Sequence, residues 1–233
     1  MEQKQLQLQP RLQLLADMVP QGARLADIGT DHGYLPVHLI QQGRITSAIA
    51  ADVGRDPLQH AVRTAEEYGV SGIEFRLCDG LCGLSAEEVD TIVIAGMGGQ
   101  TIIHILEAAP WTSNDGKYTL LLQPMTKPGL LRHWLVNHGY RILAERLVWD
   151  KDFIYPILVV TGGAQRPLSD TEAEYGFCLM GDPLYGNYLD IQIARLQRTI
   201  EGKRLSEREE ARREAALLED QRCALQRLRE ECQ

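Results

Sequence analysis

The segment LADIGTDHGYLP, residues 25–36, decides the fold, because an apolar stretch ends there in a loop that carries Gly29 and Gly33. Loops of this kind, between a strand and a helix, are where open α/β sheets bind their ligands. A dinucleotide site would have the fingerprint G-x-G-x-x-G, but Asp31 stands where the middle glycine is expected. A carboxylate there would repel a pyrophosphate by on the order of a few kcal/mol, which disfavours NAD.

A methyl donor has the opposite electrostatic requirement. S-adenosylmethionine has no phosphate and carries an α-ammonium and a sulfonium, so carboxylates at Asp27 and Asp31 would attract it. The two glycines would let its methionine part lie across the loop. Asp31 can alternatively act as the cap of the following helix, a role that aspartate fills well and that is compatible with cofactor binding.

Two more acids follow predicted strands. Asp52 ends a strand in IAADV, where it is placed to accept hydrogen bonds from ribose hydroxyls, and Asp79 follows the next strand in RLCDGL, where it can accept from an adenine amino group. Strand-end aspartates are also common turn residues. Ligands of open α/β sheets bind at the carboxyl ends of the strands, so the four acids together favour one cofactor site.

The fourth strand ends in AGMGG, residues 95–99, where Met97 is the only bulky side chain and Gly96 and Gly98 have none. This segment is either a place where a flat ring and the sulfonium meet the backbone or a plain glycine turn into a helix. Gln123-Pro124 ends the fifth strand and offers an amide for a base edge. The fourth strand lacks the Asn/Asp-Pro-Pro-aromatic motif of many amine methyltransferases, so a ring nitrogen is favoured as nucleophile.

Strand-like and helix-like segments alternate from about residue 24 to 163, which predicts a parallel sheet with crossover helices. A charged turn then joins two extended segments in RILAERLVWDKDFIYPILVVTGG, which predicts an antiparallel hairpin at the end of the sheet. Five parallel strands and a hairpin fit a seven-stranded, Rossmann-like methyltransferase sheet better than a two-halved dinucleotide fold. We expect strands at 23–29, 45–53, 73–80, 89–99 and 117–124, and helices at 11–22, 36–42, 56–68, 100–108 and 128–137.

The composition changes after residue 163, and we divide the chain into a cofactor-binding domain, 1–165, and a helical tail, 166–233. Two helices are expected in the tail, joined by a connection around residues 201–205 that includes Gly202, with the second helix starting at about Ser206. Apolar residues recur at helical spacing in both, namely Leu189, Ile193, Leu196 and Ile200 in the first and Ala211, Leu218, Leu225 and Cys232 in the second. A folded-back antiparallel hairpin is favoured over an intermolecular coiled coil.

The motifs DIGTDHGYLP, AADV, CDGL, AGMGG and QP occur in this order along the chain. In this combination the whole sequence resembles the bacterial tRNA (adenine-N1)-methyltransferases of the TrmK type. The resemblance implies a class I methyltransferase fold, S-adenosyl-L-methionine as cofactor and a C-terminal coiled-coil hairpin that helps hold tRNA. It also implies methylation of N1 of the adenine at position 22.

The resemblance further implies which residues line the cofactor: Asp27, Gly29, Asp31, His32, Asp52, Asp79, Gly96, Met97 and Gly98. Asp31, His32 and Gln123 are the candidates for orienting the base or relaying a proton from its amino group. His32 can equally be a structural histidine. A ring nitrogen attacks the methyl group with its own lone pair, so positioning and base extrusion would dominate over general base catalysis.

The formal net charge of −8 argues against a general nucleic-acid binder. Basic residues nevertheless cluster around the expected tip of the tail, with Glu201, Glu207, Glu209 and Glu210 interleaved. They either grip phosphates or form a solvated face of salt bridges. The basic residues are Arg195, Arg198, Lys203, Arg204, Arg208, Arg212 and Arg213. Arg11, Lys127 and Lys151 are expected to add a second basic region near the site.

The 233-residue chain has no apolar run near the roughly 20 residues that span a bilayer, and its start lacks a signal-peptide core. We therefore expect a cytoplasmic, monomeric protein with tRNA as partner, no membrane contact and no metal. The alternatives are a methyltransferase of another RNA or of a small molecule, and a non-catalytic tRNA-binding scaffold with a vestigial cofactor fold. An NAD-dependent oxidoreductase is the least favoured of these functions.

Overall fold

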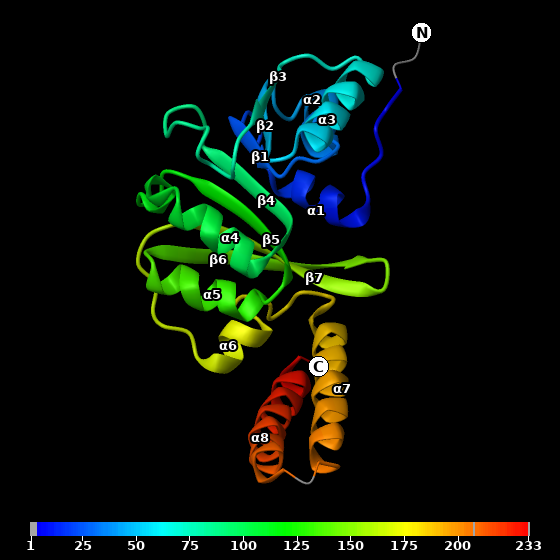
Figure 1. Ribbon diagram of the computed structural model, residues 1–233, viewed down its shortest axis with the longest axis vertical. Coiled ribbons are helices and arrows are strands. Elements are labelled where there is room, and N and C mark those ends of the chain that lie inside the picture. Colours follow the sequence, from blue (N-terminus) through cyan, green and yellow to red (C-terminus); the bar gives the residue numbers. More distant parts are fainter. Residues whose placement is uncertain (1–3, 207, 233) are drawn as a thin grey trace.

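A computed structural model describes residues 4–206 and 208–232, and a seven-stranded mixed sheet forms its centre (Figure 1). The spatial order of the strands is β3-β2-β1-β4-β5-β7-β6. Neighbouring strands among the first five run parallel, and β7 runs antiparallel to both β5 and β6. The predicted methyltransferase-type sheet with a terminal hairpin is therefore confirmed. The strands are β1 (Leu25–Ile28), β2 (Ala48–Asp52), β3 (Ile73–Leu77), β4 (Thr91–Gly98), β5 (Thr119–Thr126), β6 (Tyr140–Asp150) and β7 (Phe153–Gly162).

Helices cover both faces of this sheet, as buried parallel strands require. Helices α4 and α5 pack on one face, where Ile102 and Leu131 lie in the same apolar cluster as Ile94 of β4. Helices α1 and α2 pack on the other face, with Leu15 and Leu35 beside Val93 and Leu121 (Figure 1). The helices of this part are α1 (Pro10–Met18), α2 (Tyr34–Gln41), α3 (Arg55–Glu67), α4 (Gly99–Glu107), a 3-10 turn (Pro110–Ser113) and α5 (Pro128–Asn137).

The tail contains one helix more than we predicted. The short α6 (Asp170–Tyr175) begins at Ser169 with a complete capping box, in which the Ser169 hydroxyl accepts from the Glu172 N–H and the Glu172 carboxylate accepts from the Ser169 N–H. The sequence SDTE, residues 169–172, has the capping-box pattern. A capping box satisfies two otherwise unpaired backbone donors. Its six residues are too few to show a helical apolar period.

The two long tail helices, α7 (Tyr185–Arg204) and α8 (Glu209–Glu231), lie side by side as the predicted folded-back hairpin (Figure 1). Leu189 and Leu225 are fully buried between them and the sheet hairpin. The connection lies later than expected, because Gly202 continues α7 as a helical residue and the chain turns only after Arg204. None of the helices in the described residues is long and apolar enough to cross a membrane.

Candidate cofactor and active site

The loop after β1 takes a conformation that explains its glycines. Gly29 and Gly33 have φ angles of 71° and 66°, in the left-handed region that favours glycine. A Cβ on Gly29 would lie 2.1 Å from the Cε of Met97, so a side chain there would require the flexible Met97 side chain to move. The N–H groups of Gly29 and Thr30 both donate to the carbonyl of Ala51, at 2.8 and 3.1 Å, which ties the loop to β2.

Asp27 is a buried carboxylate at the base of this loop, with 6% of its surface exposed. The pKa of its carboxyl is raised from the ordinary 3.8 to about 6, mainly by burial; a hydrogen bond from Thr30 opposes this rise, and the nearby Asp52 carboxylate contributes to it. The Thr30 hydroxyl donates to Asp27 Oδ2 at 2.6 Å. A buried acid of this kind is stabilised in its charged form when a cation binds beside it.

Asp31 sits at the rim of the loop with its side chain 65% exposed. Its φ of 49° places a non-glycine residue in the left-handed region, which aspartate tolerates better than most residues. The Asp31 N–H donates to Asp52 Oδ2 at 3.2 Å, and the other Asp52 oxygen accepts from the Gly54 N–H at 2.8 Å. Asp52 thereby fixes the loop after β1 against the end of β2.

A cleft of about 470 Å³ opens at this loop. Its walls bring together the ends of β1 and β4 with helix α1 and the start of α2, at the carboxyl edge of the sheet where ligands of such folds bind. The lining residues include Asp27, Gly29, Asp31, His32, Gly96 and Arg11.

The end of β4 bulges beside the cleft. Gly96 has a φ of 76°, and the pairing of β4 with β5 shifts register on both sides of Met97. Gln123 of β5 holds this bulge: its amide oxygen accepts from the Gly96 N–H at 2.9 Å, and its amide nitrogen donates to the Pro124 carbonyl at 3.1 Å.

Gln123 has no exposed surface, so the structure disagrees with our expectation that its amide faces a base edge. The same oxygen accepts from Arg11 Nη1 at 2.9 Å, and Arg11 Nε donates to Asp150 at 3.2 Å. These contacts make Gln123 a positioning residue for the β4 bulge. They also pair the charge of Arg11 with an acid, which removes it from the predicted basic region.

His32 lies at the middle of a ring stack. Its ring centroid is 5.1 Å from that of Tyr34 and 5.0 Å from that of His60, with the planes nearly parallel. Asp31, His32 and His60 also bring one possible ligand atom each within 4.8 Å of one another. The expectation that the protein needs no metal therefore stays a prediction.

Four of the predicted cofactor residues stand apart from the cleft walls among the described residues, the first being Asp52, which accepts from the Asp31 and Gly54 N–H groups. Asp79 follows β3 with an exposed side chain, Met97 is half-buried under Gly29, and Gly98 leads into α4. Arg11 and Tyr34 line the cleft without having been predicted as cofactor residues. Arg11 lies far from the loop in sequence and carried no local signal, whereas Tyr34 follows the DIGTDHG motif directly.

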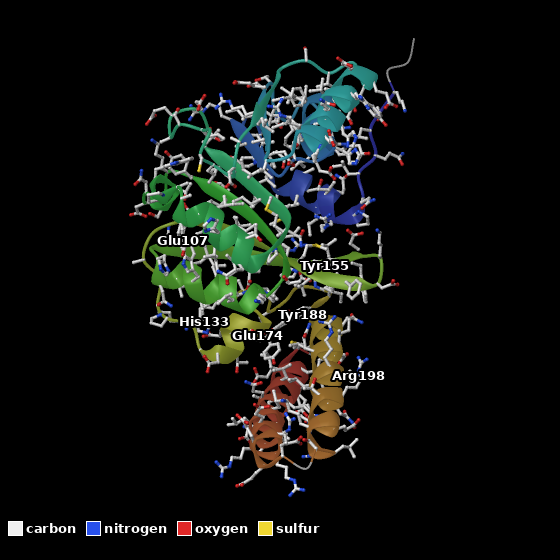
Figure 2. The ribbon with its side chains drawn as sticks, in the orientation of Figure 1. Glu107, His133, Tyr155, Glu174, Tyr188 and Arg198 are labelled. Atoms are coloured by element: carbon white, nitrogen blue, oxygen red, sulfur yellow. The ribbon has the colours of Figure 1, made fainter. Side chains whose placement is uncertain are left out.

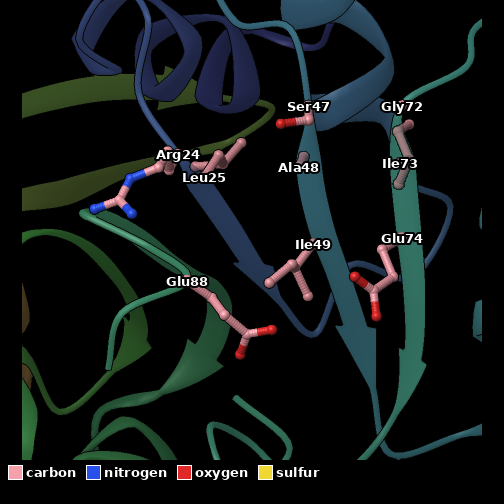
Figure 3. A pocket seen from close by; sticks show the side chains of 9 residues that line it. All are labelled: Arg24, Leu25, Ser47, Ala48, Ile49, Gly72, Ile73, Glu74 and Glu88. Carbon is pink, nitrogen blue, oxygen red and sulfur yellow. The ribbon is translucent and has the colours of Figure 1, made fainter. Parts of the chain in front are cut away.

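A second hollow, of about 580 Å³, lies at the opposite, amino-terminal edge of β1, β2 and β3 (Figure 3). Its charged residues already have protein partners. Arg24 donates to Asp90 at 3.1 Å, and Arg76 binds both Glu74 and Glu88. Since open α/β sheets bind ligands at their carboxyl edge, the cleft at Asp27 is the better cofactor site.

Comparison with known proteins agrees with this assignment. Residues 8–158 match the family described as "Methyltransferase domain". The tRNA (adenine(22)-N(1))-methyltransferase of Bacillus subtilis (strain 168) is 37% identical over 79% of this chain and 76% of its own length. The chain belongs to the tRNA (adenine(22)-N1)-methyltransferase family.

Solved structures related to this family share the whole architecture, tail included. A Streptococcus pneumoniae protein in complex with S-adenosyl-L-methionine is 34% identical, with a TM-score of 0.81, over 96% of this chain and 98% of its own. TrmK of M. capricolum, in complex with S-adenosyl-homocysteine, is 26% identical, with a TM-score of 0.80, over 97% and 99%.

The cleft of this family member fits the same cofactor. S-adenosylmethionine has cationic groups and no phosphate, and the loop offers two carboxylates, one buried at Asp27 and one at the rim on Asp31. Gly29 contributes no side chain to this loop, and a Cβ there would contact the end of the Met97 side chain. The residues present are therefore suited to a cationic methyl donor.

Proposed function

We propose that this chain is an S-adenosylmethionine-dependent methyltransferase that modifies N1 of the adenine at position 22 of tRNA. The observation that carries the proposal is the pair of carboxylates, Asp27 and Asp31, on a glycine loop that opens into a cleft of about 470 Å³. The names of the relatives supply the substrate and the modified atom.

The bound cofactor supplies a methyl group activated by a positively charged sulfur. The N1 lone pair of adenine forms the new bond to the methyl carbon while the carbon–sulfur bond breaks, and the positive charge passes to the adenine ring. No proton has to leave N1 before the attack, so the protein acts mainly by holding the two reactants in line.

The predicted acids, His32 and the residues of the β4 bulge each take a role in this scheme. Asp27 and Asp31 bind the cationic part of the cofactor, and Asp52 both fixes the loop and accepts from the ribose hydroxyls. The exposed side chain of Asp79 accepts from the adenine amino group of the cofactor. Gly96, Met97 and Gly98 form the edge against which the reacting groups lie. His32, stacked between Tyr34 and His60, presents its edge to the target base.

The tail, residues 166–233, serves as the second domain and binds the tRNA backbone. Several arginines of the tail, namely Arg195, Arg198, Arg208 and Arg212, form no ion pair with any residue that the structure describes. We expect a monomer that acts in the cytoplasm, where a tRNA substrate is found.

The test uses the purified chain, methyl-labelled S-adenosylmethionine and two unmodified tRNA transcripts that differ only in having adenine or guanine at position 22. Label recovered as N1-methyladenosine from the first transcript, and none from the second, is the expected result. Label in another nucleoside would contradict the assigned substrate atom. Transcript binding without any transfer would identify a tRNA-binding scaffold instead.

A further inference from the structure

A second groove lies at the end of β5, the strand that pairs with the β4 bulge. Its volume is about 610 Å³, and it lies between the end of β5, the sheet hairpin β6–β7 and helix α7. Figure 2 shows Tyr155 on the hairpin and Tyr188 at the start of α7 on its walls, with Glu174 of α6 nearby.

The pairing of the strands places this groove next to the reacting groups. Met97 pairs with Pro124, and Gly98 pairs with Thr126, so the β4 bulge beside the cofactor cleft and the β5 segment beside the groove form one ladder. Pro124, Met125 and Thr126 all line the groove. The cleft edge at Gly96 and the groove at Pro124 therefore lie on neighbouring strands.

The hairpin leaves an open strand edge along this groove. Strand β7 pairs with β5 only from Leu158 to Val160, so its first residues extend beyond the end of that pairing. Two aromatic side chains stand there: Phe153 is 48% exposed, and its ring centroid lies 6.0 Å from that of Tyr155. The exposed ring of Phe153 and the partly buried ring of Tyr155 offer stacking faces for unpaired bases.

The charge of the groove differs from that of the whole chain. Lys127 and Arg195 line it with exposed cationic side chains, and Glu174 is the acid among its lining residues. Two cations against one carboxylate contrast with the formal net charge of −8 for the chain. Aromatic faces with flanking cations are the combination that binds single-stranded nucleic acid.

We propose that this groove binds the unpaired nucleotides that flank the target adenine, with Phe153 and Tyr155 stacking on bases and Arg195 and Lys127 contacting phosphates. This subsite rests on the proposed tRNA substrate. It anchors the strand while the target base is turned out of its stack toward the β4 bulge, a step that every enzyme acting on a base within structured nucleic acid requires.

The test compares Phe153→Ala and Arg195→Ala with wild type in the full-length chain. Phe153→Ala is expected to raise the Kd and the KM for tRNA transcript about tenfold, because one stacking contact is lost. Arg195→Ala is expected to lower the slope of log affinity against log salt by about one, because one phosphate contact is lost. The affinity for S-adenosylmethionine should stay unchanged in both.

Matched controls separate the groove from general effects. Trp149→Ala removes an aromatic side chain, 40% exposed, from the same hairpin, and Arg213→Ala removes an exposed arginine of α8 that already pairs with Glu209; neither residue lines the groove. Both controls should bind tRNA as wild type does. Phe153→Tyr keeps a stacking ring and should restore the tRNA affinity.

Two results would overturn the proposal. Unchanged tRNA Kd, KM and salt slope in the groove variants, with N1-methyladenosine still formed by wild type, would exclude RNA from the groove while leaving the proposed function intact. An equal loss of affinity for tRNA and for S-adenosylmethionine in Phe153→Ala would indicate a structural role for Phe153. Absence of transfer by wild type, by contrast, would be a failure of the proposed function itself.

Discussion

Asp27 joins two properties that oppose each other, burial and negative charge. Its carboxyl has a pKa raised by burial from 3.8 to about 6. Above pH 6 the folded protein must hold a buried charge, so this group lowers the free energy of unfolding. As pH falls from 6 toward 4 the folded protein takes up the proton first, and the penalty disappears.

We expect Asp27→Asn to raise the free energy of unfolding at pH 8 by at most about 3 kcal/mol, since one pKa unit corresponds to about 1.4 kcal/mol. The gain should shrink toward pH 4, and urea unfolding at the two pH values measures it. Asparagine can still accept from Thr30, so the fold is kept while cofactor affinity falls. An Asp27→Asn protein that is less stable at pH 8 would show that the ionised carboxylate has favourable contacts in the free protein.

Cofactor affinity should follow the same titration. S-adenosylmethionine binding is expected to weaken below about pH 6, by up to about tenfold per pH unit, as Asp27 becomes protonated. Thr30→Val removes the hydrogen bond that lowers the Asp27 pKa, so the midpoint should move to higher pH. Calorimetric titrations from pH 5 to 8 check both, and a flat profile would show that Asp27 does not contact the cationic ligand.

A substitution at Asp31 tests whether the loop binds the cofactor through its negative charge. Asp31→Asn removes the charge but keeps a residue that tolerates the φ of 49°, so the loop conformation should survive. We expect S-adenosylmethionine to bind at least tenfold more weakly, which corresponds to about 1.4 kcal/mol for a lost ion contact, and turnover to fall with it. Binding of S-adenosylhomocysteine, which keeps the ammonium but has no sulfonium, shows which cation Asp31 recognises.

Equal weakening of both ligands would assign Asp31 to the ammonium, and weakening of S-adenosylmethionine alone would assign it to the sulfonium. Unchanged affinity for both would contradict a binding role. Asp31→Ala is a less clean variant, because alanine adopts the left-handed region less readily than asparagine.

The sequence allowed the loop residues to be predicted, but not the contacts around Gln123. Gly29, Asp31 and Gly33 lie within five positions, where glycine and charge patterns can be read directly. Arg11 meets its partners across 112 and 139 positions of chain. Such pairs depend on how the sheet brings α1 and the hairpin together, and no local pattern encodes that.

At the scale of elements, the strands were predicted well because buried parallel strands read as short apolar runs between turn residues. The α7–α8 turn was misplaced because we gave Gly202 the role of a helix end. Glycine weakens a helix by only about 1 kcal/mol relative to alanine, so α7 continues through Gly202 to Arg204.

A buried ion pair links the methyltransferase sheet to the tail. Arg132 of α5 donates to Glu145 of β6 at 2.5 Å, and both side chains are inaccessible to solvent. The other Glu145 oxygen accepts from the N–H groups of Phe177 and Cys178, at 2.6 and 2.8 Å, in the segment between α6 and α7. Arg132 also donates to the Ala173 carbonyl of α6.

Arg132→Met should therefore lower the free energy of unfolding by about 3–5 kcal/mol, because it leaves the Glu145 carboxylate buried and unpaired. Adding Glu145→Gln removes that charge, keeps an acceptor for the two N–H groups, and should restore part of the loss. Chemical denaturation of the single and double variants measures the difference. A double variant that is less stable than Arg132→Met would show that the unpaired charge is not the main cost.

At the scale of the whole molecule, most basic residues of the tail are paired with acids. Arg213 pairs with Glu209 at 2.7 Å and Arg229 with Asp190 at 2.9 Å, and Lys203 and Arg204 also have acidic partners. The predicted acid Glu207 lies outside the described residues. Paired cations release few counterions when a phosphate approaches, so tRNA binding should depend on the arginines without partners.

The last prediction compares the two kinds of arginine on the tail hairpin. Arg198 of α7, labelled in Figure 2, and Arg212 of α8 form no ion pair within residues 4–206 and 208–232. Replacing both by glutamine should lower the salt slope of tRNA binding by about two, with weaker binding at low salt. Arg213→Gln is the matched control on the same helix, and it should change the slope by less than one because Glu209 already neutralises its charge.

All of these side chains lie on the helix surface, so the free energy of unfolding should change by less than about 0.5 kcal/mol per substitution. Filter binding of tRNA transcript between 50 and 300 mM salt, on the order of the range in which phosphate contacts dominate, gives the slopes. Equal slopes for wild type and the double variant would mean that tRNA approaches the sheet domain without contacting Arg198 or Arg212. The unpaired cations of the second groove would then carry the electrostatic part of tRNA binding.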